Sequence, residues 1–81
     1  MRLRCLFFAA SRELAGCRET ELEVPEPCTA GEALDLLLLR FPKVASLRPS
    51  LQVAVNHKYT PLDTPVTDGD ELALIPPISG G

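Results

Sequence analysis

The chain has 81 residues, of which 46% are hydrophobic and 23% are charged, and its net charge at neutral pH is −3. This balance predicts one small globular domain and excludes a disordered chain. The acidic charge argues against a nucleic-acid partner, and no apolar run approaches the roughly 20 residues of a bilayer span. A domain of this size has little room for both a core and an enclosed catalytic cleft, which favours a carrier, adaptor or subunit over a stand-alone enzyme.

Residues 2–8 are predicted to form a β-strand, because apolar and other side chains alternate there with a period of two. Every second residue is expected to face the core, namely Leu3, Cys5 and Phe7. Leu6 and Phe8 then face outward. The apolar run is too short for a secretory signal and charged residues follow it at once, so we expect a cytoplasmic protein.

A short helix and a second strand are predicted next. Ser11 is expected to cap a helix that runs through Ala15 and ends at Gly16, a residue suited to the left-handed conformation after a helix. Residues 18–24 place glutamates on one face of a strand and apolar side chains on the other. The short connection predicts that the two strands pair in antiparallel fashion.

The main helix is predicted to begin at Thr29, which together with Glu32 matches a capping box. Its apolar residues recur at helical spacing and are expected to lie on a sheet; they are Leu34, Leu37, Leu38 and Phe41. Pro42 is expected to end this helix, and residues 43–50 are expected to form a loop.

Two further strands are predicted, at residues 51–55 and 71–75. The first leads through a turn at residues 56–58 into Tyr59, and prolines make the segment after it irregular. A tight turn around Gly69 precedes the second, which is expected to turn Ala73 and Ile75 outward. The order β-β-α-β-β predicts an α+β roll, in which one main helix crosses a mixed sheet.

The last six residues form a tail that two prolines separate from the final strand. It comprises Pro76, Pro77, Ile78, Ser79, Gly80 and Gly81. Glycines lack a Cβ atom, so a flexible tail that ends in two of them is suited to a narrow channel, where it would present its terminal carboxylate to another protein. The alternative is a frayed end without function.

Neither a metal site nor a disulfide framework is predicted. The cysteines at 5, 17 and 28 are odd in number and lack C-x-x-C spacing, so we expect reduced thiols. Asp68, Asp70 and Glu71 lie close in sequence without the spacing of a calcium loop, and turn chemistry explains them better.

The outward apolar residues of the first and last strands predict a docking surface. If these strands are parallel neighbours, Leu6, Phe8, Ala73 and Ile75 gather beside the root of the tail. An apolar patch of this kind indicates a protein partner, whereas single exposed apolar residues are ordinary.

The chain resembles the small, sulfur-carrier subunits of molybdopterin synthase (the MoaD family), which are ubiquitin-like β-grasp proteins. The resemblance covers the whole chain and rests on five segments: Leu6-Phe7-Phe8-Ala9, Arg12-Glu13-Leu14, Val55-Asn56, Thr67-Asp68-Gly69-Asp70-Glu71 and Pro76-Pro77-Ile78-Ser79-Gly80-Gly81. It implies a single β-grasp domain over residues 1–81 with residues 76–81 as the functional tail.

The resemblance further implies that Gly81 is adenylated by a partner similar to ubiquitin-activating enzymes, which uses ATP and magnesium. A sulfur donor then converts the adenylate to a thiocarboxylate. Sulfur passes to cyclic pyranopterin monophosphate in the large synthase subunit, within a heterotetramer, to build the dithiolene of the molybdenum cofactor. The chain itself is then a non-catalytic carrier that binds no cofactor, and Phe8, Tyr59 and Ile75 contact the large subunit.

Three other functions remain open from the sequence. The chain could be a ubiquitin-like modifier whose Gly81 is joined to lysines of target proteins. It could supply sulfur to another pathway, for thiamine or tRNA thiolation. It could also be a binding module with an inert tail.

Overall fold

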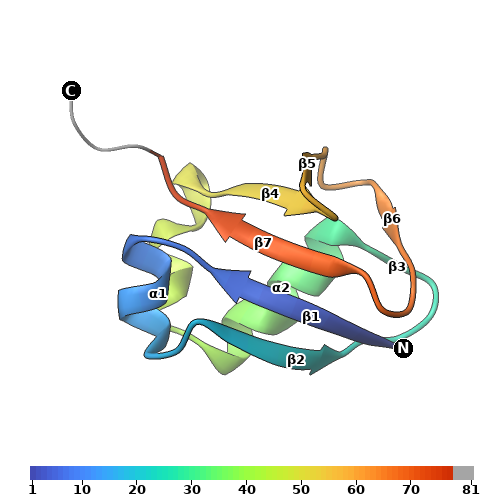
Figure 1. Cartoon of the computed structure of the whole chain (residues 1–81), viewed down its shortest axis with the longest axis horizontal. Helices are drawn as coiled ribbons and strands as arrows, with labels where there is room; N and C mark the ends of the chain where they lie inside the picture. The colour runs from blue at the N-terminus through green and yellow to red at the C-terminus, as the bar shows by residue number, and fades with distance from the viewer. Residues whose placement is uncertain (78–81) are drawn as a thin grey trace.

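The computed structural model describes residues 1–77, in which a mixed sheet lies against one long helix (Figure 1). The sheet has the strand order β2-β1-β7-β4-β5. Its members are β1 (Arg2–Phe7), β2 (Glu19–Glu23), β4 (Gln52–Val55), β5 (Lys58–Tyr59) and β7 (Glu71–Ile75). The remaining elements are α1 (Ala10–Ala15), β3 (Cys28–Thr29), α2 (Ala30–Arg40), the 3₁₀ helix η1 (Val44–Ser50) and β6 (Pro65–Val66).

The neighbouring strands β1 and β7 run parallel, and the other pairs in this sheet are antiparallel. The register pairs Cys5 with Leu72 and Leu6 with Ala73. The first and last strands of the chain are therefore neighbours, and both end beside α1 (Figure 1). This arrangement confirms the predicted α+β roll.

The core lies between α2 and the sheet face that it covers. Leu34 and Leu37 of α2 are buried, as are Leu72 and Leu74 of β7. At the end of the helix the ring of Phe41 meets Phe7 edge to face, with a centroid separation of 4.9 Å. Burial raises the pKa of the Cys5 thiol to about 12, so this side chain packs as a neutral apolar group.

The predicted capping box of α2 is confirmed. The Thr29 hydroxyl accepts a hydrogen bond from the Glu32 amide at 3.2 Å, and the Glu32 carboxylate accepts one from the Thr29 amide at 2.9 Å. Across residues 1–77, none of the helices combines the length and the apolar character that a bilayer crossing demands.

The secondary-structure prediction was wrong at several places in the chain. Residues 44–50 form η1 instead of a loop, because Val44 is fully buried and Arg48 forms an ion pair with Asp35 of α2. The segment after Tyr59 was expected to be irregular, but Pro65 and Val66 form β6 and pair with β3. Strands of two residues are too short to show a period in the sequence.

The predicted tight turn before β7 is confirmed around Gly69, whose φ is +86°. The Asp70 carboxylate accepts hydrogen bonds from the Asn56 side chain at 2.9 Å and the Thr67 amide at 2.8 Å. Burial raises the pKa of Asp70, but these hydrogen bonds outweigh it and hold the pKa below its ordinary value. The turn thus ties the start of β7 to the β4–β5 hairpin.

We expect Asp70→Asn to lower the free energy of unfolding by about 1–2 kcal/mol at pH 7, because charge-assisted hydrogen bonds are lost. Ionised Asp70 stabilises the fold above its unfolded pKa of about 3.9, and this contribution disappears as the pH falls through the lower folded pKa. Urea denaturation at pH 7 and near pH 2 should therefore show the variant approaching wild type in acid. Asp63→Asn, at an exposed position, is the matched control; an equal deficit at both pH values would contradict the prediction.

Candidate docking groove and tail root

A row of four residues crosses the sheet on the face opposite α2. The register pairs Leu6 of β1 with Ala73, Ala73 with Ala54, and Ala54 with Tyr59 of β5. Side chains that are paired across neighbouring strands point to the same face. The small side chains of Ala73 on β7 and Ala54 on β4 thus lie between the larger Leu6 and Tyr59.

These residues form a shallow groove of about 260 Å³. Phe8 and Ile75 line it on the side where β7 ends, and His57 and Glu71 line the opposite side, with 3.5 Å between His57 Nδ1 and Glu71 Oε2. Phe8 is 47% exposed and Tyr59 is 65% exposed. Large apolar side chains that remain this exposed beside a groove are suited to bury surface against a protein.

The structure brings together the three residues expected to contact a partner. Phe8, Tyr59 and Ile75 all line the groove, as do Leu6 and Ala73 of the predicted patch. Ala73 was expected to face outward and does so, yet it is buried because its larger neighbours cover it. Ala54, on the groove floor, was not predicted, since only the register of β4 on β7 reveals its place.

The tail comprises residues 76–81, and its first residue, Pro76, directly follows Ile75 of the groove. Ile75 lines the groove, Pro76 is buried, and Pro77 is exposed. The other tail residues singled out from the sequence, Ile78, Ser79, Gly80 and Gly81, lie outside the described residues. A protein that covers the groove therefore also covers the point from which the tail begins.

Ser11 was predicted to cap α1, and this prediction was wrong. The residue at the N-cap is Ala9, with φ +52°, and no side chain caps the helix. Ser11 is instead fully buried within α1, where its hydroxyl donates a hydrogen bond to the Phe8 carbonyl at 2.7 Å and accepts one from the Phe8 amide at 3.0 Å. Ser11 thereby holds the backbone of Phe8 at the rim of the groove.

We expect Ser11→Ala to lower the free energy of unfolding by about 1–3 kcal/mol, because the Phe8 amide loses its acceptor. Urea denaturation checks the stability, and hydrogen exchange at the Phe8 amide checks the local effect. Ser46→Ala removes only an exposed hydroxyl and serves as the control, with an expected change under about 0.5 kcal/mol. Unchanged protection of the Phe8 amide in Ser11→Ala would show that Ser11 does not hold this turn.

Of the three acidic residues near the turn before β7, only Glu71 lines the groove; Asp68 and Asp70 lie elsewhere, as do the cysteines. Asp68 accepts a hydrogen bond from the Arg2 amide at 2.7 Å, and Asp70 belongs to the turn already described. Within residues 1–77 no three histidine, cysteine, aspartate or glutamate side chains gather closely enough to hold a metal ion. All three cysteines are free thiols, and Cys5 and Cys28 are buried.

Comparison with known proteins gives consistent matches over the full chain. The ThiS family profile matches residues 5–81. The chain is 41% identical to the molybdopterin synthase sulfur carrier subunit of Arabidopsis thaliana and 45% identical to that of Drosophila erecta. Each match covers 100% of this chain, with 84% of the first relative and 92% of the second.

Solved structures share the fold. SAMP1 from Haloferax volcanii superposes with a TM-score of 0.92 at 33% identity, over 100% of both chains. Subunit 1 of the molybdopterin-converting factor from Helicobacter pylori, solved in complex with subunit 2, has a TM-score of 0.73 at 23% identity, again over 100% of both chains. These likenesses agree with the predicted β-grasp architecture.

Proposed function

The chain belongs to the ThiS family and, within it, to the molybdopterin synthase sulfur carrier subunits of molybdenum cofactor biosynthesis, and from this premise we propose that Gly81 carries the sulfur as a terminal thiocarboxylate. Residues 76–81 act as the arm that delivers it, and residues 1–75 act as the docking body. The chain is a protein co-substrate, and its partners supply the catalytic groups of transfer.

The chemistry requires activation because a carboxylate is a poor electrophile. A Gly81 carboxylate oxygen attacks the α-phosphorus of ATP on an adenylyltransferase, and pyrophosphate leaves with magnesium. A sulfur donor then displaces AMP from the acyl carbon. The resulting thiocarboxylate sulfur is a soft nucleophile, which the large synthase subunit positions against cyclic pyranopterin monophosphate. Positioning of this kind supplies much of the acceleration of such a step.

The observation that supports this proposal most is the exposed apolar groove at the root of the tail. Phe8, Tyr59 and Ile75 line it, and burial of about 300 Å² there would contribute several kcal/mol before the costs of association. We propose that the large subunit of the synthase covers this groove while the tail enters its active site. The Helicobacter pylori protein was solved as a complex of subunits 1 and 2 of molybdopterin-converting factor.

A second candidate function has one observation in its favour. The Haloferax volcanii structure, at 33% identity, is a small archaeal modifier protein, so the same fold also suits a protein modifier. Both functions would use an activated Gly81. They differ in the acceptor, which is sulfur for a carrier and a lysine amine for a modifier.

The intact mass of the chain, purified from cells that make the molybdenum cofactor, tests the proposal. Replacement of one oxygen by sulfur, mapped to Gly81, is the result expected of a carrier. Gly81 joined to lysines of other proteins, without the sulfur form, would make the chain a modifier. A chain that forms no conjugates in cells, and that stays unmodified after supply of the activating enzyme, ATP and a sulfur donor, would overturn both.

A further inference from the structure

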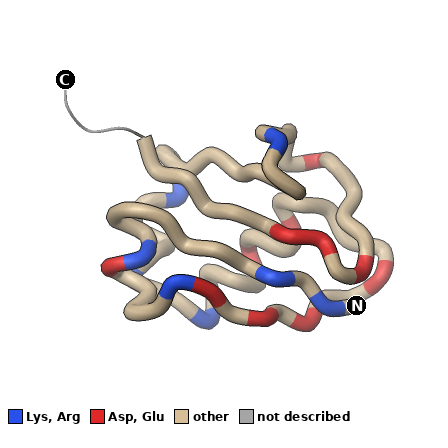
Figure 2. Tube along the Cα trace, viewed as in Figure 1, with Lys and Arg blue, Asp and Glu red and all other residues tan. Residues whose placement is uncertain are grey.

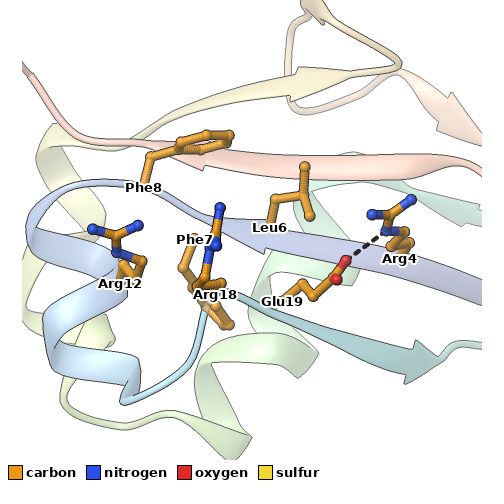
Figure 3. Close-up of a pocket in the computed structure, with 7 residues that line it drawn as sticks. All are labelled: Arg4, Leu6, Phe7, Phe8, Arg12, Arg18 and Glu19. Atoms are coloured by element: carbon orange, nitrogen blue, oxygen red, sulfur yellow. Dashed lines mark hydrogen bonds and ion pairs between the residues drawn. The ribbon is translucent and has the colours of Figure 1, made fainter.

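A second hollow, of about 290 Å³, lies on the other side of Phe8 from the docking groove. Leu6 and Phe8 line both hollows, so the two surfaces are continuous. Arg12 of α1 and Arg18, just before β2, add basic side chains to the second hollow (Figure 3). Arg4 and Glu19 line its far side and pair with each other at 2.6 Å.

This hollow differs from the rest of the described surface in holding arginine side chains that are not paired. Within residues 1–77, neither Arg12 nor Arg18 has an ion pair or a side-chain hydrogen bond. Every other arginine is engaged: Arg2 with Glu21 and Glu23, Arg4 with Glu19, Arg40 with the Glu21 carbonyl, and Arg48 with Asp35. The two guanidinium groups that lack a partner among residues 1–77 therefore lie in one place.

The location of these two arginines relates to the tail. Acidic positions gather toward the end of the sheet that carries the N-terminus, whereas basic positions are frequent at the end that carries α1 (Figure 2). β7 also ends at the α1 end, so the tail root shares it with Arg12 and Arg18. A protein that approaches the groove from above Phe8 meets both guanidinium groups at the rim of the contact.

We propose that Arg12 and Arg18 bind carboxylate side chains of the large synthase subunit, at the rim of the interface that begins in the docking groove. This inference rests on the proposed function. A guanidinium group matches a carboxylate with two parallel hydrogen bonds, and the adjoining Leu6 and Phe8 exclude water from one side of the pair. Charged pairs at the rim of an interface mainly raise the association rate and fix orientation.

Charge reversal tests the inference in the complete chain. Arg12→Glu and Arg18→Glu should each lower the association rate with the large subunit about tenfold at low salt, and the difference should shrink to about twofold or less near 0.5 M salt. Lys43→Glu makes the same charge change outside both hollows and should alter the rate by less than about twofold. Thermal unfolding confirms that all three variants are folded.

A chemical readout identifies the bound group. Arg18→Lys keeps the charge and introduces an amine, which a carbodiimide joins only to a carboxylate in contact with it. We expect mass spectrometry to find residue 18 cross-linked to an aspartate or glutamate of the large subunit, while Lys43 in the same sample remains unlinked. The same reaction is run with the adenylyltransferase in place of the large subunit. Cross-links of residue 18 only to the adenylyltransferase, or none to either protein, would overturn the assignment.

The outcomes separate this inference from the proposed function. If both charge-reversal variants associate as fast as wild type while Gly81 still carries sulfur, the inference alone fails. An equal loss of rate in Lys43→Glu would also overturn it, since overall charge would then explain the effect. If wild type neither acquires sulfur nor binds the large subunit, the proposed function fails and the inference fails with it.

Discussion

Deletion of Gly81 is expected to reduce sulfur transfer at least about 100-fold while leaving the fold unchanged. The shortened chain still ends in a glycine carboxylate, but that carboxylate lies about 3.5 Å short of its normal reach. Reacting atoms must approach to about 3–3.5 Å, and a misplacement of 1 Å can cost about 100-fold in rate. Single-turnover transfer with the large subunit measures the effect, and urea denaturation measures the fold.

Two further variants distinguish the length of the tail from the identity of its residues. An alanine added after Gly81 moves the carboxylate in the opposite direction and should fail to a similar extent. Ile78→Val keeps the length of the tail and should transfer sulfur within about threefold of wild type. Normal transfer by the chain that lacks Gly81 would remove the terminal residue from the mechanism.

Phe8→Asp and Ile75→Asp are each expected to weaken binding of the large subunit about 100-fold or more. Each substitution removes an apolar side chain from the groove and places an unpaired carboxylate in the contact. Phe8 is already 47% exposed in the free chain, so its replacement should lower the free energy of unfolding by less than about 1 kcal/mol. Isothermal titration calorimetry measures the affinity.

Leu39 provides the matched control for these variants. It is 78% exposed on α2, which covers the opposite face of the sheet. Leu39→Asp should therefore leave the affinity within about twofold of wild type. Equal losses in Leu39→Asp and Phe8→Asp would place the interface elsewhere or make it nonspecific.

The parts of the fold that were predicted from the sequence are those with a sustained local pattern. Alternation marked β1 and β2, a short apolar run behind a tight turn marked β7, and a helical stripe behind a capping box marked α2. Each of these patterns reflects one buried face, which the sequence records directly. The outward positions of Leu6, Phe8 and Ile75 followed from the same alternation, which is why most of the groove could be predicted.

The parts that were missed depend on contacts between distant residues. β3 and β6 are held partly by the bonds of the Ala30 and Gly31 amides to the Thr64 and Leu62 carbonyls, both at 2.8 Å. The hydroxyl of Ser11 lies 3.4 Å from the Leu74 carbonyl, 63 positions away in the chain. A serine at a predicted helix start is indistinguishable from a cap until that packing is known. Tyr59 entered the site through family resemblance, since its short strand shows no period.

The alternation of side chains along β7, part of the groove floor, determines which substitutions the fold can accept there. Along β7, Leu72 and Leu74 face α2, whereas Ala73 and Ile75 face the groove. Neighbouring positions of β7 are thus under separate constraints: the even-numbered residues pack the core, and the odd-numbered residues shape the groove. One larger side chain at position 73 would fill the groove between Leu6 and Ala54 without entering the core. Single substitutions on this face can therefore reshape the groove, while the other face keeps the domain folded.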